Sequence, residues 1–352
     1  MTPVPVTLLT GFLGAGKTTL LNRLLRHPDM ADTAVLVNEF GEIGLDHLLV
    51  EALDEDTVLL NAGCLCCTVR GDLVRALRGL AARMEAGRPL RRVAIETTGL
   101  ADPAPILQTL MAEPLLLRHF RLDGVVTLVD AVAGMATLDA QPEAVKQAAV
   151  ADRLVLTKTD RAAPDRVAAL RARLAALNPG APLLEAVRGE IAPAALLGCG
   201  PFDAAGKAPE VARWLAAEAG AAHAHGHHHD PNRHDARIRA FCLTFEEPLP
   251  WDGLATWLEV LAMTRGESVL RVKGILHLQG EERPVAIHGV QHLFHPPVRL
   301  AAWPRGEDGR EDRRSRLVFI LRDLDRAAVE KGLDAFLASA REQAGIAAAG
   351  RG

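Results

Sequence analysis

Tyrosine is absent from this sequence of 352 residues, and the other large aromatic residues are limited to nine Phe and four Trp. The core must therefore consist mostly of Leu, Val and Ala, and no tyrosine is available for catalysis. Five cysteines are too few to form the disulfide scaffold of a secreted protein of this length. No run of about 18 uncharged apolar residues is present, because the best candidate, 124–138, is interrupted by Asp130. We therefore predict no membrane-spanning segment.

Charge is nearly balanced, with 40 basic and 44 acidic residues and a net charge of −4. This balance gives no general attraction to nucleic acid or to an anionic membrane, so neither is an expected partner. The N-terminus lacks the basic segment of a signal peptide, and its apolar start leads directly into a glycine-rich loop. We therefore expect a cytoplasmic protein whose thiols are kept reduced.

Apolar runs alternate with helical patterns through the first 200 residues. Strands are predicted at 4–10, 34–37, 57–60, 92–95, 124–129 and 153–156, and helices at 17–25, 72–84 and 164–177. This alternation predicts an α/β fold over 1–200, with a mostly parallel sheet and helices on both faces. Ala, Gly and His dominate 201–235, which predicts a linker. A smaller α+β domain is predicted at 236–345, with strands at 238–245, 269–278, 284–290 and 316–321 and helices at 251–264 and 325–340.

Residues 11–18, Gly-Phe-Leu-Gly-Ala-Gly-Lys-Thr, match the phosphate-binding motif G-x-x-x-x-G-K-[ST] in full. The glycines let backbone N–H groups surround phosphate oxygens, Lys17 reaches the β- and γ-phosphates, and the Thr18 hydroxyl binds Mg²⁺. The motif follows a predicted strand and opens a predicted helix, as this chemistry requires; the alternative is a glycine turn that binds nothing. The predicted nucleotide ligands here are Gly11, Gly14, Ala15, Gly16, Lys17, Thr18 and Thr19.

Two further segments complete a nucleotide site. Glu96 follows strand 92–95 and supplies the carboxylate that a P-loop needs near its metal ion, as a longer substitute for the usual Asp; a helix N-cap or a plain strand end is the alternative. Gly99 would let the backbone approach the γ-phosphate. Thr157-Lys158-Thr159-Asp160 follows strand 153–156 and is similar to the Asn-Lys-x-Asp tetrad of guanine-specific proteins. Asp160 accepts from guanine N1 and N2, and the stem of Lys158 covers the ring, which favours GTP over ATP.

Three of the five cysteines, Cys64, Cys66 and Cys67, follow strand 57–60, at the sheet edge where the P-loop is also expected. Clustered thiolates bind Zn²⁺ and other soft or borderline metals in preference to Mg²⁺. The alternatives are small core residues, a disulfide, which such close neighbours form poorly, and a structural zinc site, which needs four ligands. Glu39 and Glu42 follow strand 34–37 and are candidates to reach this metal, the Mg²⁺ or the attacking water; otherwise they are solvated loop acids.

Six histidines lie between His223 and His234, inside the predicted linker. We interpret this tract as a low-affinity segment that gathers metal ions. The alternatives are an expression tag or a neutral flexible linker, although a tag is normally terminal and uniform.

Together these motifs resemble the CobW family of P-loop GTPases, also called zinc-regulated GTPase metal chaperones, over nearly the whole chain. The matching segments are 11–18, 38–42, 64–67, 96–99, 101–103 and 157–160 in the first domain, and 270–274 and 288–291 in the second. The combination of Cys-x-Cys-Cys with a P-loop is the most specific of these features. The sequence departs from the family pattern at Thr157, in place of Asn, and at Val37, where a further carboxylate before Asn38 is missing.

The resemblance implies a GTPase that binds Zn²⁺, or Co²⁺ in the cobalamin branch, and delivers it to a client metalloprotein. We expect catalytic roles for Lys17, Thr18, Glu96 and Glu39, and metal ligands at Cys64, Cys66, Cys67 and Glu42. GTP and Mg²⁺ would order the loops that carry these ligands, and hydrolysis would release them. A homo-oligomer that depends on nucleotide or metal is left open. The alternative functions are a zinc buffer or sensor that uses GTP only as a structural ligand, and a P-loop small-molecule phosphotransferase.

Overall fold

The computed structural model describes residues 2–38, 57–60, 67–199, 237–305 and 309–349. The chain divides into two compact units, Met1–Pro201 and Phe202–Gly352. The predicted linker at 201–235, with its histidine tract, lies outside the described residues. None of the helices in the described ranges has the length and hydropathy that a membrane crossing requires.

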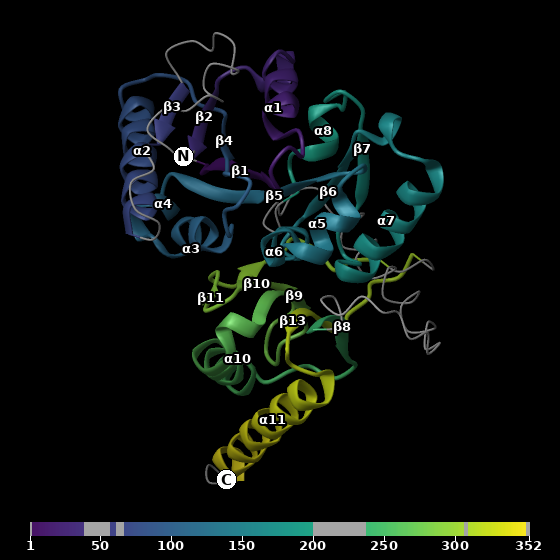
Figure 1. Ribbon diagram of the computed structural model, residues 1–352. Helices are drawn as coiled ribbons and strands as arrows, with labels where there is room; N and C mark the ends of the chain where they lie inside the picture. The colour runs from purple at the N-terminus through teal and green to yellow at the C-terminus, as the bar shows by residue number, and fades with distance from the viewer. Residues whose placement is uncertain (1, 39–56, 61–66, 200–236, 306–308, 350–352) are drawn as a thin grey trace. The chain divides into compact units, whose positions relative to one another are not determined.

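The first unit contains a seven-stranded sheet in which every strand pair is parallel (Figure 1). Its strands are β1 (Val4–Gly11), β2 (Thr33–Asn38), β3 (Thr57–Leu60), β4 (Arg92–Glu96), β5 (Phe120–Asp130), β6 (Arg153–Thr157) and β7 (Leu183–Ala186). Their spatial order is β3-β2-β4-β1-β5-β6-β7. Strands β2, β3 and β4 lie on one side of β1, and β5, β6 and β7 lie on the other, so the strand order reverses beside β1. The sequences of β1 and β6 are nearly continuous apolar runs, because strands in a sheet that is covered on both faces are buried on both sides.

Helices cover both faces of this sheet (Figure 1). They are α1 (Lys17–Leu25), α2 (Cys67–Glu85), α3 (Ala104–Ala112), α4 (Pro114–Leu117), α5 (Gly134–Ala140), α6 (Pro142–Ala149), α7 (Pro164–Leu177) and α8 (Pro193–Leu196), with 3₁₀ turns η1 (Pro28–Met30) and η3 (Thr159–Arg161). Leu20 and Leu24 of α1, one helical turn apart, pack into the same core cluster as Val126 of β5. On the opposite face, α3 contacts β5, and α6 contacts both β1 and β5.

The second unit is an antiparallel sheet with two long helices. Its elements are β8 (Ile238–Phe245), α10 (Trp251–Arg265), η5 (Gly266–Ser268), β9 (Val269–Leu276), β10 (Val285–Val290), β11 (Leu293–Phe294), β12 (Val298–Arg299), β13 (Ser315–Arg322) and α11 (Arg326–Ala349). The strand order is β11-β10-β9-β13-β8, and β12 pairs with β10. Leu254 of α10 and Leu333 of α11 are fully buried in one core cluster with Leu317 and Phe319 of β13.

The predicted combination of an α/β unit and a smaller α+β unit is confirmed. Three predicted elements were clearly too short, and one of them, the helix predicted at 325–340, spans Arg326–Ala349. The helix predicted at 72–84 spans 67–85, because its first turn precedes the apolar repeat that begins at Leu73. The strand predicted at 124–129 spans 120–130, because Asp123-Gly124, which resembles a turn, forms a bulge inside the strand. The buried Asp123 carboxylate accepts hydrogen bonds from Thr7, Arg92 and the amide of Gly198, which makes that bulge stable.

Candidate nucleotide and metal site

Four neighbouring strands of the first unit, β3, β2, β4 and β1, have their carboxyl ends at the same edge of the sheet. Glu96, the last residue of β4, is in register with Leu9 of β1 on one side and with Val37 of β2 on the other. Asn38 at the end of β2 is in register with Leu60 at the end of β3. In open parallel sheets, ligands bind beyond the carboxyl ends of the strands, where the strand order reverses. This edge of the sheet is therefore the candidate site.

The segments that carry the predicted ligands all start at this edge. The phosphate-binding loop follows β1, the chain toward Glu39 and Glu42 follows β2, and the chain toward Cys64 and Cys66 follows β3. These two glutamates and two cysteines lie outside the described residues. Cys67 is the first residue of α2, and its side chain also lies outside them. Their roles as metal or water ligands therefore remain predictions.

The phosphate-binding loop uses backbone conformations that glycine adopts without strain, with φ of 73° at Gly14 and 92° at Gly16. Lys17 begins α1 directly after the loop and is buried. Its Nζ donates hydrogen bonds to the carbonyl oxygens of Gly11 at 2.9 Å and Phe12 at 3.3 Å. The ammonium group is thus held within the loop, beside the positive end of the α1 dipole. Both features favour a bound phosphate.

Thr18 of α1 and Glu96, the last residue of β4, are in direct contact. Thr18 Oγ1 donates a hydrogen bond to Glu96 Oε1 at 2.9 Å, and the Glu96 residue is only 5% exposed. A hydroxyl oxygen and a carboxylate oxygen are the ligand types that hold Mg²⁺ in P-loop sites. The residues present therefore fit the Mg²⁺ expected from the sequence, with Glu in the position where Asp is usual.

The segment after β4 lies against the phosphate-binding loop. A Cβ atom on Gly99 would come within 2.5 Å of Leu13 N and 2.7 Å of Leu13 Cα, so a larger residue cannot fit unless the loop moves. Thr97 Oγ1 donates to Thr10 Oγ1 at 2.8 Å, which joins the two strand ends. The Thr98 hydroxyl is buried, with no hydrogen-bond partner in the described part of the chain. A buried polar oxygen of this kind is stabilised when a ligand or a water molecule meets it.

Thr157 joins the predicted base-binding loop to the phosphate-binding loop. Its Oγ1 donates to the carbonyl oxygen of Ala15 at 2.8 Å, with a longer contact of 3.4 Å to that of Val129. Lys158 adopts a left-handed backbone conformation with φ of 57°, and its Nζ donates to Asp130 Oδ2 at 2.6 Å. Asp160 lies in η3 and is exposed, so its carboxylate is accessible to a base.

Two polar residues beside this site were not identified from the sequence. Asp130 ends β5, pairs with Lys158 and accepts from the amide of Val132 at 2.7 Å. Its position directly after an apolar strand was the signal that could have revealed it. Gln147 of α6 is fully buried and binds the segment after β4. No sequence signal distinguishes it from an exposed helical glutamine.

Two known protein families match this chain. The family described as CobW/HypB/UreG, nucleotide-binding domain, matches residues 5–185. The family described as Cobalamin synthesis protein cobW C-terminal domain matches residues 238–337. The first match contains every described residue of the predicted nucleotide site.

Individual relatives show the same relationship. Zinc chaperone YjiA of Escherichia coli (strain K12) is 34% identical over 321 residues, which cover 91% of this chain and 94% of the relative. Zinc-regulated GTPase metalloprotein activator 1 of Schizosaccharomyces pombe is 38% identical over 196 residues, or 54% of this chain and 47% of the relative. The crystal structure of Zn(II)-bound YjiA GTPase from E. coli has a TM-score of 0.67 and 28% identity, covering 96% of this chain and 99% of that one.

Proposed function

The chain belongs to the CobW family, and we propose that it is a GTP-hydrolysing metallochaperone that binds Zn²⁺ and transfers it to a client metalloprotein. Relatives named zinc chaperone and zinc-regulated GTPase metalloprotein activator support this function. The observation that carries the proposal is the common edge of β3, β2, β4 and β1. The phosphate-binding loop, Glu96 and the chain segments leading to the cysteines all begin at that edge.

The described residues of the edge bind and orient GTP in this proposal. Lys17 neutralises charge on the β- and γ-phosphates from within the loop. Mg²⁺, when bound, would offset the negative charge that develops on the phosphates during hydrolysis. Thr18 Oγ1 and Glu96 Oε1 are the oxygens that would hold it. Asp160 selects guanine, and Lys158, held by Asp130, covers the base.

Zinc is the cargo in this proposal. Cys64, Cys66 and Cys67 provide thiolates and Glu42 a carboxylate, a ligand set that suits Zn²⁺. Glu39 precedes them along the chain and would orient the attacking water. Bound GTP orders the loops that carry these ligands and so completes the zinc site. Loss of the γ-phosphate releases the loops and weakens the zinc site. Ligand exchange with a client then becomes favourable.

The substitution Cys66→Ala tests the zinc site. Zinc affinity, measured by competition with a chromogenic chelator, should fall at least about 10-fold, because a thiolate ligand is lost. GDP affinity in metal-free buffer should stay within about twofold, since no phosphate or base contact changes. Cys242→Ala is the matched control, because that half-buried thiol lies on β8 of the second unit. Zinc affinity that is unchanged in Cys66→Ala would refute the site.

Lys17→Ala separates a GTP-driven chaperone from a zinc buffer that uses GTP only as a structural ligand. The variant loses the ammonium group that the phosphate-binding loop holds. GTP turnover should fall, and the rate of zinc transfer to an apo-metalloprotein acceptor should fall with it. Transfer at the wild-type rate, despite lost turnover, would favour the buffer.

A further inference from the structure

Helix α6 anchors the segment that follows β4 through two consecutive residues. Gln147 Nε2 donates hydrogen bonds to the carbonyl oxygens of Gly99 at 3.1 Å and Ala101 at 3.0 Å. Lys146 Nζ donates to Asp102 Oδ2 at 2.8 Å, and Asp102 Oδ1 accepts from the backbone amide that begins α3. One short helix therefore fixes the whole turn between β4 and α3.

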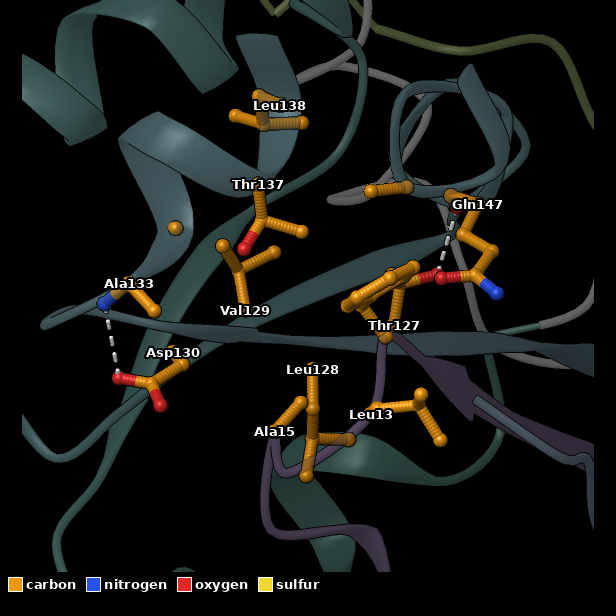
Figure 2. A pocket seen from close by; sticks show the side chains of 13 residues that line it. Leu13, Ala15, Thr127, Leu128, Val129, Asp130, Ala133, Thr137, Leu138 and Gln147 are labelled. Carbon is orange, nitrogen blue, oxygen red and sulfur yellow. Dashed lines mark hydrogen bonds between the residues drawn. The ribbon is translucent and has the colours of Figure 1, made fainter. Parts of the chain in front are cut away.

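The orientation of the Gln147 side chain follows from its chemistry. The residue is 0% exposed, and its amide faces two carbonyl oxygens, so it must present Nε2 to them. The reversed amide would bring three acceptor oxygens together without a proton between them. The backbone carbonyl of Gln147 also accepts from Thr127 Oγ1 of β5 at 2.8 Å, as Figure 2 shows. The helix is thus fixed to the sheet at the same residue that holds the turn.

Gly99 lies between this amide and the phosphate-binding loop. Leu13 closes its other side so tightly that a Cβ atom would stand 2.5 Å from Leu13 N. Gln147 and Leu13 also line a small cavity of about 30 Å³, beside Thr127 (Figure 2). Gln147 Oε1 is buried and has no hydrogen-bond partner in the part of the chain that is described. A cavity of this size accommodates a water molecule that could donate to that oxygen.

We propose that Gln147 is a positioning residue for GTP hydrolysis, because its amide holds the Gly99 peptide against the phosphate-binding loop. This inference rests on the proposed GTPase function, in which Gly99 faces the γ-phosphate. GDP lacks that phosphate. Loss of the Gln147 amide therefore impairs turnover and the binding of a GTP analogue, and leaves GDP binding nearly unchanged. A residue that only stabilised α6 would affect both nucleotides alike or neither.

The substitution Gln147→Met tests the proposal, because methionine has a similar length and removes both donated hydrogen bonds. Asn178→Leu is the matched control. Asn178 is also a buried amide. It donates to the carbonyl oxygens of Ala148 and Ala149 at the end of α6 and of Ala151 just after it, and among the described residues it makes no hydrogen bond to the turn after β4. Both variants lose a buried amide beside the same helix. Their thermal midpoints should therefore fall by similar amounts.

The measurements are kcat and KM for GTP, and the affinities for GDP and a non-hydrolysable GTP analogue. In Gln147→Met, kcat should fall at least about 10-fold, since small misplacements near reacting groups have effects of this size or larger. The ratio of analogue affinity to GDP affinity should fall in the same variant. Both quantities should stay near the wild-type values in Asn178→Leu. If Gln147→Met does not fold, Lys146→Ala takes its place, with a smaller change in the same direction.

A wild-type kcat and affinity ratio in Gln147→Met, or equal losses in both variants, would overturn the proposal. Failure of the GTPase function gives a different result, because the wild-type chain would then release no phosphate from GTP. In that case the affinity ratio for the analogue and GDP still decides whether Gln147 acts on the γ-phosphate side of the site.

Discussion

Thr18 Oγ1 donates a hydrogen bond to Glu96 Oε1 at 2.9 Å, although 78 positions separate the two residues. The contact exists because β1 and β4 are parallel neighbours, so the helix that follows β1 starts beside the last residue of β4. In the proposed function, these two oxygens would hold Mg²⁺. That assignment leads to a direct substitution experiment.

Glu96→Gln should lower GTP turnover about 100-fold, the size of effect seen when a charge-stabilising group is removed from an active site. Glutamine retains an oxygen that accepts from Thr18 and loses only the negative charge. Phosphate release should be followed as a function of Mg²⁺ concentration, and GDP affinity should be measured in chelator. Glu190→Gln, at an exposed ion pair with Arg23, is the control. Wild-type turnover of Glu96→Gln at every Mg²⁺ concentration would exclude Glu96 as a ligand.

Thr157→Val should destabilise the chain by about 1–3 kcal/mol, because the Ala15 carbonyl loses a buried hydrogen-bond donor. Guanine nucleotides should also bind more weakly, since this bond joins the base-binding loop to the phosphate-binding loop. Denaturant unfolding and calorimetric titration with GDP measure the two effects. Thr157→Ser keeps the hydroxyl and should remain close to wild type. Equal GDP affinity in the valine and serine variants would show that the connection does not matter for binding.

Asp312 makes the stability of the second unit depend on pH. A hydrogen bond from Arg314 holds the pKa of Asp312 well below its ordinary value of 3.8, burial opposes this shift, and Arg316 adds to it. A lowered pKa in the folded state stabilises the fold above the unfolded pKa, and the stabilisation is lost as the pH falls toward the folded pKa. Asp312→Asn should therefore be clearly less stable than wild type at neutral pH, and the difference should shrink below about pH 4.

Tryptophan fluorescence during urea unfolding measures this effect, because the three tryptophans among the described residues, Trp251, Trp257 and Trp303, all lie in the second unit. Trp257 and Trp303 are buried there, so their emission should change when that unit unfolds. Curves for wild type and Asp312→Asn at pH 7 and at about pH 3 give the comparison. The same stability difference at both pH values would contradict the role of the Asp312 charge.

Local sequence patterns predicted much of the fold. Helices 17–25 and 164–177 and strands 57–60 and 238–245 match the observed bounds, because apolar spacing and clear end signals coincide there. Helices α3, α4, α5, α6 and α8, of four to nine residues each, were missed because they are too short for a helical period to be clear. Strand β7 was missed because it is an edge strand with mostly half-exposed residues rather than an apolar run.

In the predicted site, too, some features follow from local sequence patterns and others depend on how distant segments pack. The proximity of Thr18 to Glu96, and the place of Lys17 in the phosphate-binding loop, could be predicted, because a motif and the end of a neighbouring strand fix their positions; their roles remain predictions. The contact of Gln147 with Gly99 could not be predicted from the sequence, because it joins residues 48 positions apart and depends on how α6 packs. The contact of Thr157 with Ala15 depends in the same way on the distance between two loops.

Control of the zinc site by the nucleotide is the central claim, and zinc affinity in two nucleotide states tests it most directly. The dissociation constant for Zn²⁺ should be measured on the wild-type chain with Mg²⁺ and GDP, and again with Mg²⁺ and a non-hydrolysable GTP analogue. We predict tighter binding with the analogue; a difference of about 10⁴-fold would correspond to a coupling free energy of about 5.5 kcal/mol. Zinc must then tighten analogue binding by the same factor. Equal zinc dissociation constants with GDP and with the analogue would contradict the claim.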